Sequence, residues 1–170
     1  MTRIARGALL AATALLAGCA TLGALGQIVQ PPTFTVDRSQ QAQLRILGPS
    51  AGRPSGGLSL RLYARVHNPN PLGLTLTTLA GALSLEGQQA AQVSFPLGVP
   101  LGANQENVVP LDISISFSEL PGLANVAQKA LTGAPLRYSL NGTFGVDAGP
   151  LGRPTFGPTT LLEGDVRAFR

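Results

Sequence analysis

The feature that most constrains the fold is a strict alternation of apolar and polar residues from Leu58 to His67. Successive side chains of a β-strand point to opposite faces, so a period of two is typical of a strand with one buried and one solvated face. Runs of the same period occur at 109–117 and 136–146. Shorter strand-like runs occur at 33–37, 42–47, 74–86, 90–95 and 160–169. The sequence therefore predicts a mainly β protein with seven to eight strands.

One segment between these strands breaks the alternation. Between Ser118 and Gly133, apolar residues recur at intervals of three and four, which is the spacing of an amphipathic helix. Ser118 can cap the helix, Glu119 suits the positive end of the helix dipole, and Gly133 suits a C-terminal stop. We expect one short α-helix at about 119–131. The expected fold class is an immunoglobulin- or fibronectin-III-like antiparallel β-sandwich whose end this helix closes.

The N-terminus has the layout of an export signal. Arg3 and Arg6 precede an uncharged apolar run that ends in Leu-Ala-Gly-Cys at residues 16–19. This ending resembles the bacterial lipobox, whose cysteine is acylated and becomes the new N-terminus after cleavage. The resemblance implies a lipidated Cys19.

This interpretation divides the chain into three parts. We expect a lipoprotein signal peptide at 1–18, a lipidated N-terminus and tether at 19–31, and a folded domain at 32–170. The alternative is an uncleaved anchor, because residues 7–26 are uncharged and about as long as the ~20 residues of a membrane-spanning helix. In both cases the domain is exported and held at the cell membrane or outer membrane, facing the periplasm or the exterior. With one cysteine in the chain, it can form no internal disulfide.

The strand that ends at His67 is followed by Asn68-Pro69-Asn70-Pro71. Asparagine side chains can bond to backbone amides two residues on, and each proline keeps the preceding residue extended. We interpret this turn as a rigid exit from the sheet with a structural role. The alternative is that Asn68, Asn70 and His67 form a polar rim that contacts a ligand or a client protein.

The Asn-Pro turn and two later features resemble the WHy (water stress and hypersensitive response) domain of the type 2 late embryogenesis abundant (LEA) proteins. In order, the features are the turn itself, a glycine-containing hairpin at 83–87, and a strand with Tyr138 and Gly142 after the helix. The resemblance covers roughly residues 30–169. It implies a folded, non-catalytic protein that shields other proteins or membranes during water stress, above all desiccation.

The sequence offers little for catalysis or for metal binding. His67 is the only histidine, no recognised motif places a serine or aspartate beside it, and the eight carboxylates are dispersed. The arginines are scattered singly, which argues against nucleic-acid binding. We therefore expect no enzyme activity, no cofactor and no bound metal.

The expected partners are the membrane, through lipidated Cys19, and client proteins or lipids. The alternative function is a lipoprotein binding or accessory module of the cell envelope with a lipid or protein ligand. An exposed apolar patch of several hundred Å² or an apolar cavity between the sheets would favour this module. A uniformly polar exterior over a filled core would favour the shield.

Overall fold

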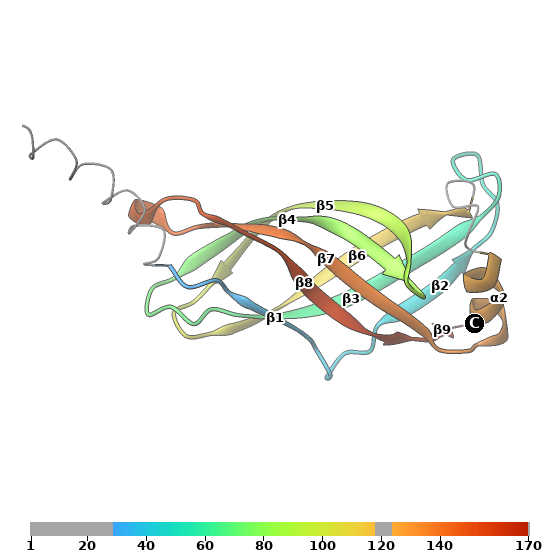
Figure 1. The fold of residues 1–170 in the computed structure, drawn as a ribbon, viewed down its shortest axis with the longest axis horizontal. Helices are drawn as coiled ribbons and strands as arrows, with labels where there is room; N and C mark the ends of the chain where they lie inside the picture. Colours follow the sequence, from blue (N-terminus) through green and yellow to red (C-terminus); the bar gives the residue numbers. More distant parts are fainter. Residues whose placement is uncertain (1–28, 118–123, 170) are drawn as a thin grey trace, which may run out of the picture.

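The computed structural model describes residues 29–117 and 124–169, which form two β-sheets and one α-helix (Figure 1). In chain order, the elements are β1 (Thr33–Val36), β2 (Gln43–Leu47), β3 (Gly57–His67), β4 (Leu74–Leu85), β5 (Gln88–Leu101), β6 (Glu106–Ser116), α2 (Ala124–Thr132), β7 (Leu136–Asp147), the 3-10 helix η2 (Gly149–Leu151), β8 (Thr155–Val166) and β9 (Ala168–Phe169). The predicted mainly β composition is confirmed, and β9, with two residues, is the one short addition to the eight expected strands.

The strands are divided between two sheets. Sheet 1 is built around β3, which pairs with β6 along one edge and with β1 and β2 along the other. Sheet 2 has the strand order β5-β4-β7-β8. All pairs are antiparallel except the short pair between β2 and β9. Among the described residues β6 pairs with β3 alone, so Pro110 lies in an edge strand, where the N–H that proline lacks need not break a ladder.

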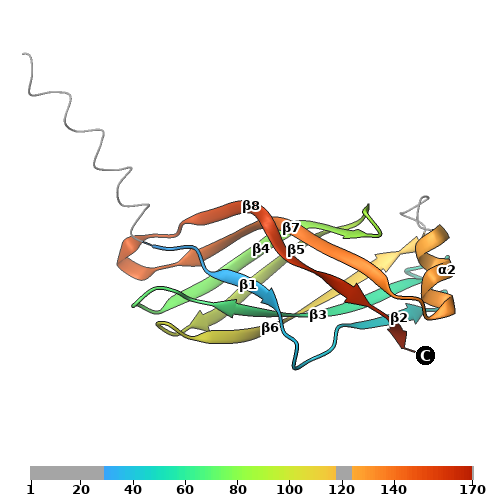
Figure 2. The ribbon, with the colours of Figure 1, turned by 60° about the horizontal axis from the view of Figure 1, so that its bottom comes forward.

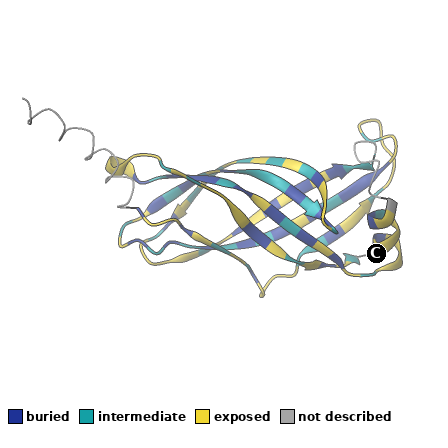
Figure 3. Ribbon diagram, viewed as in Figure 1, coloured by how far each residue is buried: buried dark blue, intermediate teal, exposed yellow. Residues whose placement is uncertain are grey.

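The two sheets lie one above the other (Figure 2), and buried residues alternate with exposed ones along many of their strands (Figure 3). The predicted alternation is confirmed, because the apolar positions of the three clearest strands are buried. These positions are Leu58, Leu60, Leu62, Ala64 and Val66 in β3; Val109, Leu111, Ile113 and Ile115 in β6; and Leu136, Tyr138, Leu140, Phe144 and Val146 in β7.

Aromatic rings join the two sheets near β1. The ring centroid of Phe34, in sheet 1, is 4.7 Å from that of Phe144, in sheet 2, and Phe144 is 5.4 Å from Phe156. Both distances are in the range of favourable tilted aromatic pairs. This row of three rings fills the core where β1 and β8, the edge strands of the two sheets, face each other.

The expected hairpin connects β4 and β5. Leu85 pairs with Gln88, and Glu86 and Gly87 between them have φ angles of 52° and 78°. Positive φ at both turn residues gives the tight connection that suits the twist of antiparallel strands. The turn that the sequence predicts here is therefore confirmed.

Helix α2 lies at one end of the two-layer body, beside the start of β7 (Figure 2). Val126 and Ala130 face the core and are buried, and Gly133 follows the helix with a φ of 71°. The predicted amphipathic helix and its glycine stop are thus confirmed for the described part. The expected N-terminal residues Ser118 and Glu119 lie outside the described residues.

Candidate functional site

The turn after β3, which we call the corner, contains two buried polar side chains. Asn68 is 0% exposed and Asn70 is 1% exposed. The Nδ2 group of Asn68 donates to the carbonyl oxygens of Leu72 at 2.9 Å and Gly102 at 3.0 Å, and so joins its own turn to the loop between β5 and β6. Its Oδ1 atom accepts the backbone N–H of Asn70 at 3.0 Å, as the two-residue spacing predicts.

Asn70 extends these contacts to the segment before β1. Its Nδ2 group donates to the carbonyl oxygen of Gln30 at 2.8 Å, and its Oδ1 atom accepts the backbone N–H of Gln30 at 2.8 Å. The same Nδ2 group also donates to Oδ1 of Asn68 at 2.8 Å. The side-chain amide thus pairs with Gln30 as a neighbouring strand would. We call Asn68, Asn70 and the groups they bind the amide cluster.

The amide cluster has a structural arrangement. Donors and acceptors of both asparagines are used within the protein, and Pro69 and Pro71 fix the backbone that carries them. His67, the third residue of the alternative polar rim, takes no part in these bonds through its buried Nδ1 atom, which has no hydrogen-bond partner in the described part of the chain. The contacts therefore favour a scaffold over a ligand-binding rim.

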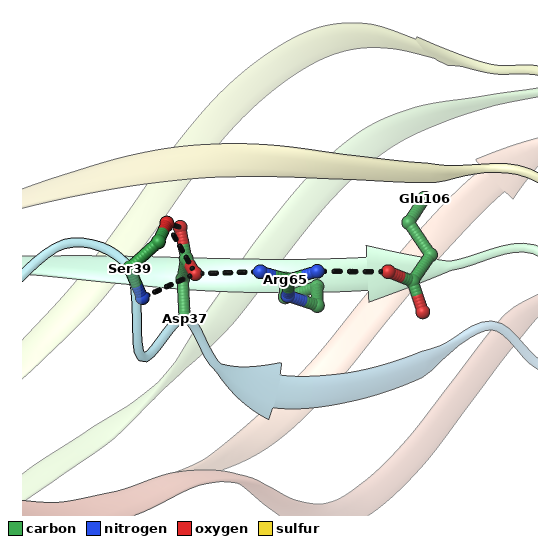
Figure 4. A network of polar contacts seen from close by, with 4 residues as sticks. All are labelled: Asp37, Ser39, Arg65 and Glu106. Carbon is green, nitrogen blue, oxygen red and sulfur yellow. Dashed lines mark hydrogen bonds and ion pairs between the residues drawn. The ribbon is translucent and has the colours of Figure 1, made fainter.

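A second polar network follows β1 (Figure 4). The Asp37 side chain is fully buried and accepts hydrogen bonds from the backbone N–H of Ser39 at 3.0 Å and from Nη2 of Arg65 at 2.7 Å. Nη1 of Arg65 donates to Glu106 at 3.0 Å. We call Asp37, Ser39, Arg65 and Glu106 the carboxylate cluster. It joins the end of β1 to β3 and β6.

The electrostatics of the carboxylate cluster follow from these contacts. The hydrogen bond from Arg65, followed by that from the Ser39 backbone, lowers the pKa of Asp37, and burial opposes this shift. The hydrogen bonds to Asp37 and Glu106 raise the pKa of Arg65. Asp37 and Arg65 are therefore both charged at neutral pH, and each has its partner within the protein.

The two other motif residues, Tyr138 and Gly142, lie in β7. Burial, with a smaller contribution from the charge of Asp165, raises the pKa of the Tyr138 phenol. Gly142 pairs with Gly81 of β4, and a methyl group at Gly142 would lie 2.1 Å from the carbonyl oxygen of Ala80. The close approach of β4 and β7 therefore requires glycine at this position.

Two hollows follow the line where β1 and the loop after it face β8. Their volumes are about 950 and 680 Å³, and both are lined by Val36, Arg38 and Glu163. Their linings mix apolar groups with charges of both signs, and His67 lies in neither. In the described ranges, no three His, Cys, Asp or Glu side chains are grouped closely enough to hold a metal ion. Neither hollow presents a nucleophile beside a base, which a catalytic triad requires.

Part of the outer face of sheet 2 carries no charged side chain. On sheet 2, strand pairing places Ala82 between Gln92 and Asn141, and Ala80 between Ser94 and Thr143. We call these six residues the neutral face. They are exposed or half-buried, whereas the alternate positions Leu79 and Leu83 are buried.

The outer face of sheet 1 carries ion pairs. Nε of Arg61 lies 2.5 Å from Oδ1 of Asp112, and Nη2 lies 2.9 Å from Oδ2, so that the two groups form a bidentate pair. The pair between Arg65 and Glu106 lies on the same strands, β3 and β6.

Sheet 2 also carries charges beyond the neutral face, because the exposed Arg137 of β7 pairs in register with Asp165 of β8, and Glu163 of β8 pairs with Ser139. The neutral face is therefore one uncharged part of sheet 2.

The predicted lipidation site Cys19, the signal segment and most of the tether lie outside the described residues. Among the helices that the structure describes, none has the length and apolar character needed to cross a membrane.

Two sheets with almost only antiparallel pairs, one helix and a corner held by internal amide contacts define a class of mainly β domains. The LEA_2 family model, described as late embryogenesis abundant protein, matches residues 63–159. The chain belongs to this family. No curated protein matches the chain.

Two solved structures are similar in fold. A solution structure of a protein from Arabidopsis thaliana has a TM-score of 0.59 and 14% identity, and the match covers 84% of this chain and 85% of that chain. A solution structure of a protein described as late embryogenesis abundant (LEA) has a TM-score of 0.51 and 17% identity, with 81% of this chain and 71% of that chain covered. At these identities the similarity concerns the fold.

Proposed function

We propose that this LEA_2 protein is a WHy-domain lipoprotein of bacterial type that protects proteins or membranes of the cell envelope during water stress, without catalysis. In this proposal residues 1–18 are the signal peptide, 19–31 the lipidated N-terminus and tether, and 32–170 an immunoglobulin- or fibronectin-III-like domain. Membership of the LEA_2 family is the observation that carries the proposal, because it relates the chain to water stress.

The neutral face supports a shielding mechanism. As water is lost the effective dielectric constant falls, and charged groups attract their neighbours more strongly. The neutral face offers hydroxyl, amide and methyl groups and no formal charge. We infer that it separates partly unfolded neighbours without binding them tightly.

The distribution of exposed apolar side chains supports the shield over a binding or accessory module. Among the described residues, the exposed large hydrophobic side chains are those of Ile46, Val108, Leu131 and Leu151, which belong to four different elements. A docking surface for a lipid or protein ligand needs such residues to be contiguous.

The amide cluster supports the proposed anchoring geometry. Gln30 is bonded to Asn70, so the chain enters the domain at the corner that follows β3. Cys19 lies ten residues before Val29, a distance of at most about 35 Å when extended. A lipid on Cys19 therefore keeps this corner close to the envelope membrane and leaves the other end exposed to clients.

The proposal is tested by drying lactate dehydrogenase with the protein or with an inert sandwich of equal size and measuring the activity recovered on rehydration. We expect higher recovery with the protein. The double variant Gln92→Glu with Ser94→Lys adds charges beside the two alanines of the neutral face. With this variant, the recovered enzyme activity should be no higher than with the inert control. The matched variant Val108→Lys with Ser114→Glu places the same charges on the edge strand of sheet 1 and should protect as the wild type does. Equal protection by the wild type and the inert sandwich contradicts the proposal.

The anchor and the cellular role have separate tests. Mass spectrometry of the mature N-terminus should find acyl mass on Cys19, with Cys19→Ala as the control, and an unmodified, uncleaved chain excludes the lipoprotein. Deletion of the gene should reduce survival after drying but not ordinary growth. Loss of growth under both conditions would favour the accessory module.

A further inference from the structure

A shallow hollow on the outer face of sheet 1 has no part in the proposed protection. Its volume is about 460 Å³, and it is lined by Gln40, Gln41, Gln43, Arg45 and Tyr63. A smaller hollow of about 100 Å³ shares Gln43 and Arg45 with it and extends to the ion pair of Arg61 and Asp112. Together they form one polar depression across β2 and β3. We call it the glutamine hollow.

The polar side chains of the glutamine hollow are available to a ligand. Within the described residues, the amides of Gln40, Gln41 and Gln43 and the guanidinium of Arg45 make no hydrogen bond or ion pair with the protein. Each amide can donate and accept at once. By contrast, Arg61 is committed to Asp112. The hollow therefore combines three free amides with one free cation.

Tyr63 provides the aromatic group of this depression. Its carbonyl oxygen accepts the backbone N–H of Asp37 at 2.9 Å, and on its other side the residue pairs with Pro110 of β6. The nearby Tyr63 side chain makes a minor contribution to the raised pKa of Arg61, after the larger effect of Asp112. The backbone of Tyr63 is thus held in place on both sides.

These groups define the class of ligand. A sugar ring has vicinal hydroxyls, each a donor and an acceptor, and an apolar face of C–H groups that can lie against an aromatic ring. One free arginine is too little charge for a phosphate-rich ligand, and the polar lining is unsuited to an acyl chain. The volume lies in the usual range for small-molecule sites. We propose that the glutamine hollow binds a neutral hexose oligosaccharide, with a sugar ring against Tyr63 and its hydroxyls bonded to the three glutamine amides and Arg45.

The position of the hollow keeps it accessible in the anchored protein. Strand β2 pairs with residues 57–61 of β3, whereas the corner that receives the N-terminal segment follows residue 67 at the other end of the strand. The site therefore lies on the half of sheet 1 farther from the proposed anchor, and it faces away from sheet 2. It can reach either a free oligosaccharide or a glycan of the cell envelope.

The test is calorimetric titration of the full chain with maltotriose and cellotriose, in a detergent without a sugar headgroup. We expect a Kd on the order of 1 mM, because a shallow site covers one side of the ligand. Tyrosine fluorescence gives a second readout, since the chain has two tyrosines and no tryptophan, and Tyr138 is buried. Tyr63→Phe should keep the affinity within about 3-fold, and Tyr63→Ala should weaken it by about 10-fold or more, as loss of an aromatic contact does.

Two further variants separate binding from folding. Gln40→Ala with Gln41→Ala changes only an exposed loop and should weaken binding without changing the thermal midpoint. Ser114→Ala lies on the same outer face outside both hollows and should bind as the wild type does. No heat or fluorescence change up to 50-fold above the expected Kd, or equal binding by Tyr63→Ala, would overturn the proposal. So would binding to heparin with none to the neutral sugars.

Affinity electrophoresis in gels that contain dextran or amylopectin distinguishes the two sources of the sugar. Retardation by either polymer indicates that the site accepts internal sugars of a chain, as an envelope glycan presents them. Binding of maltotriose or cellotriose in the calorimeter without retardation by either polymer indicates a free oligosaccharide. Both results support the assignment of the ligand class.

Discussion

The amide cluster and the carboxylate cluster hold the same N-terminal segment with different chemistry. The amide cluster binds Gln30, just before β1, and the carboxylate cluster binds through Asp37, just after it. Strand β1 has only four residues and pairs with β3 on one edge, so it is secured at both ends by side chains.

The two clusters differ in charge and in exposure. The side chains of Asn68 and Asn70 are buried and neutral. The carboxylate cluster is charged, and around its buried Asp37 the side chains of Arg65 and Glu106 are 38% and 50% exposed. Burial makes a neutral hydrogen bond costly to lose, and exposure screens an ion pair. The stability of the fold should therefore depend most on the amide cluster, and only the contribution of the carboxylate cluster to stability should change with pH.

The largest effect is expected for Asn68→Ala. This change leaves the Asn70 backbone N–H and the Leu72 and Gly102 carbonyls without their partner inside the corner. We expect a loss of about 4 kcal/mol in the free energy of unfolding, measured by urea denaturation. Asn125→Ala, on the exposed side of α2, is the control and should change stability by about 0.5 kcal/mol at most. Similar losses for Asn68→Ala and Asn125→Ala would show that the amide cluster is not the main support of the fold.

Asn70→Ala should have the second largest effect, about 2–3 kcal/mol, because it removes the paired bonds to Gln30 but leaves the Asn68 bonds to Leu72 and Gly102. Hydrogen exchange should show faster exchange of the Gln30 amide. The amide of Asp37, which bonds to the Tyr63 carbonyl, is an internal reference. Unchanged protection at Gln30 would mean that the amide cluster does not hold the N-terminal segment.

Asp37→Asn should lower the free energy of unfolding at pH 7 by less than Asn70→Ala does, and it should change how stability depends on pH. The pKa of Asp37 is lower in the folded protein than in the unfolded chain, where it is about 3.9. Its contribution is therefore full above the unfolded value and is lost as the pH falls through the folded value. Thermal midpoints from pH 7 to pH 2 should fall less steeply for Asp37→Asn than for the wild type, while Asn68→Ala keeps the wild-type slope. Parallel curves for all three proteins would refute the distinction.

The smallest effect is expected for Glu106→Gln. The carboxylate is half exposed, and its pair with Arg65 should contribute about 0.5 kcal/mol or less. Raising the salt concentration to about 1 M should remove most of the difference from the wild type, because screening is strong at that ionic strength. A loss as large as that of Asn70→Ala would show that the exposed pair is a main support of β1.

The sequence predicts much of the fold, because the period of two records which side of each strand is buried. Two of its errors at strand ends share one physical cause. The predicted run at 90–95 ends before Pro96 and the predicted run at 160–169 begins after Pro158, yet β5 and β8 continue through these prolines. Both are edge strands, in which a missing N–H need not break a ladder.

The two clusters were predictable to different degrees. The bond from Asn68 to the Asn70 backbone is local, so the Asn-Pro motif indicates it. Gln30 lies 40 residues from Asn70, and Asp37 lies 28 residues from Arg65, so their contacts depend on the strand register. In the sequence, Asp37 is an ordinary polar residue at the end of a strand. No local pattern marks it as the buried centre of a cluster.

The reciprocal bonds between Gln30 and Asn70 have a mechanical consequence in the proposed anchored form. When the membrane that holds the anchor moves relative to the rest of the envelope, the tether transmits tension to the domain. The tension reaches these two bonds before it reaches β1. The force is then passed to the proline-stiffened corner and to the loop between β5 and β6, and the edge strand is not peeled from its neighbour. A cell that shrinks and swells with its water supply would thus pull on the stiffest part of the molecule.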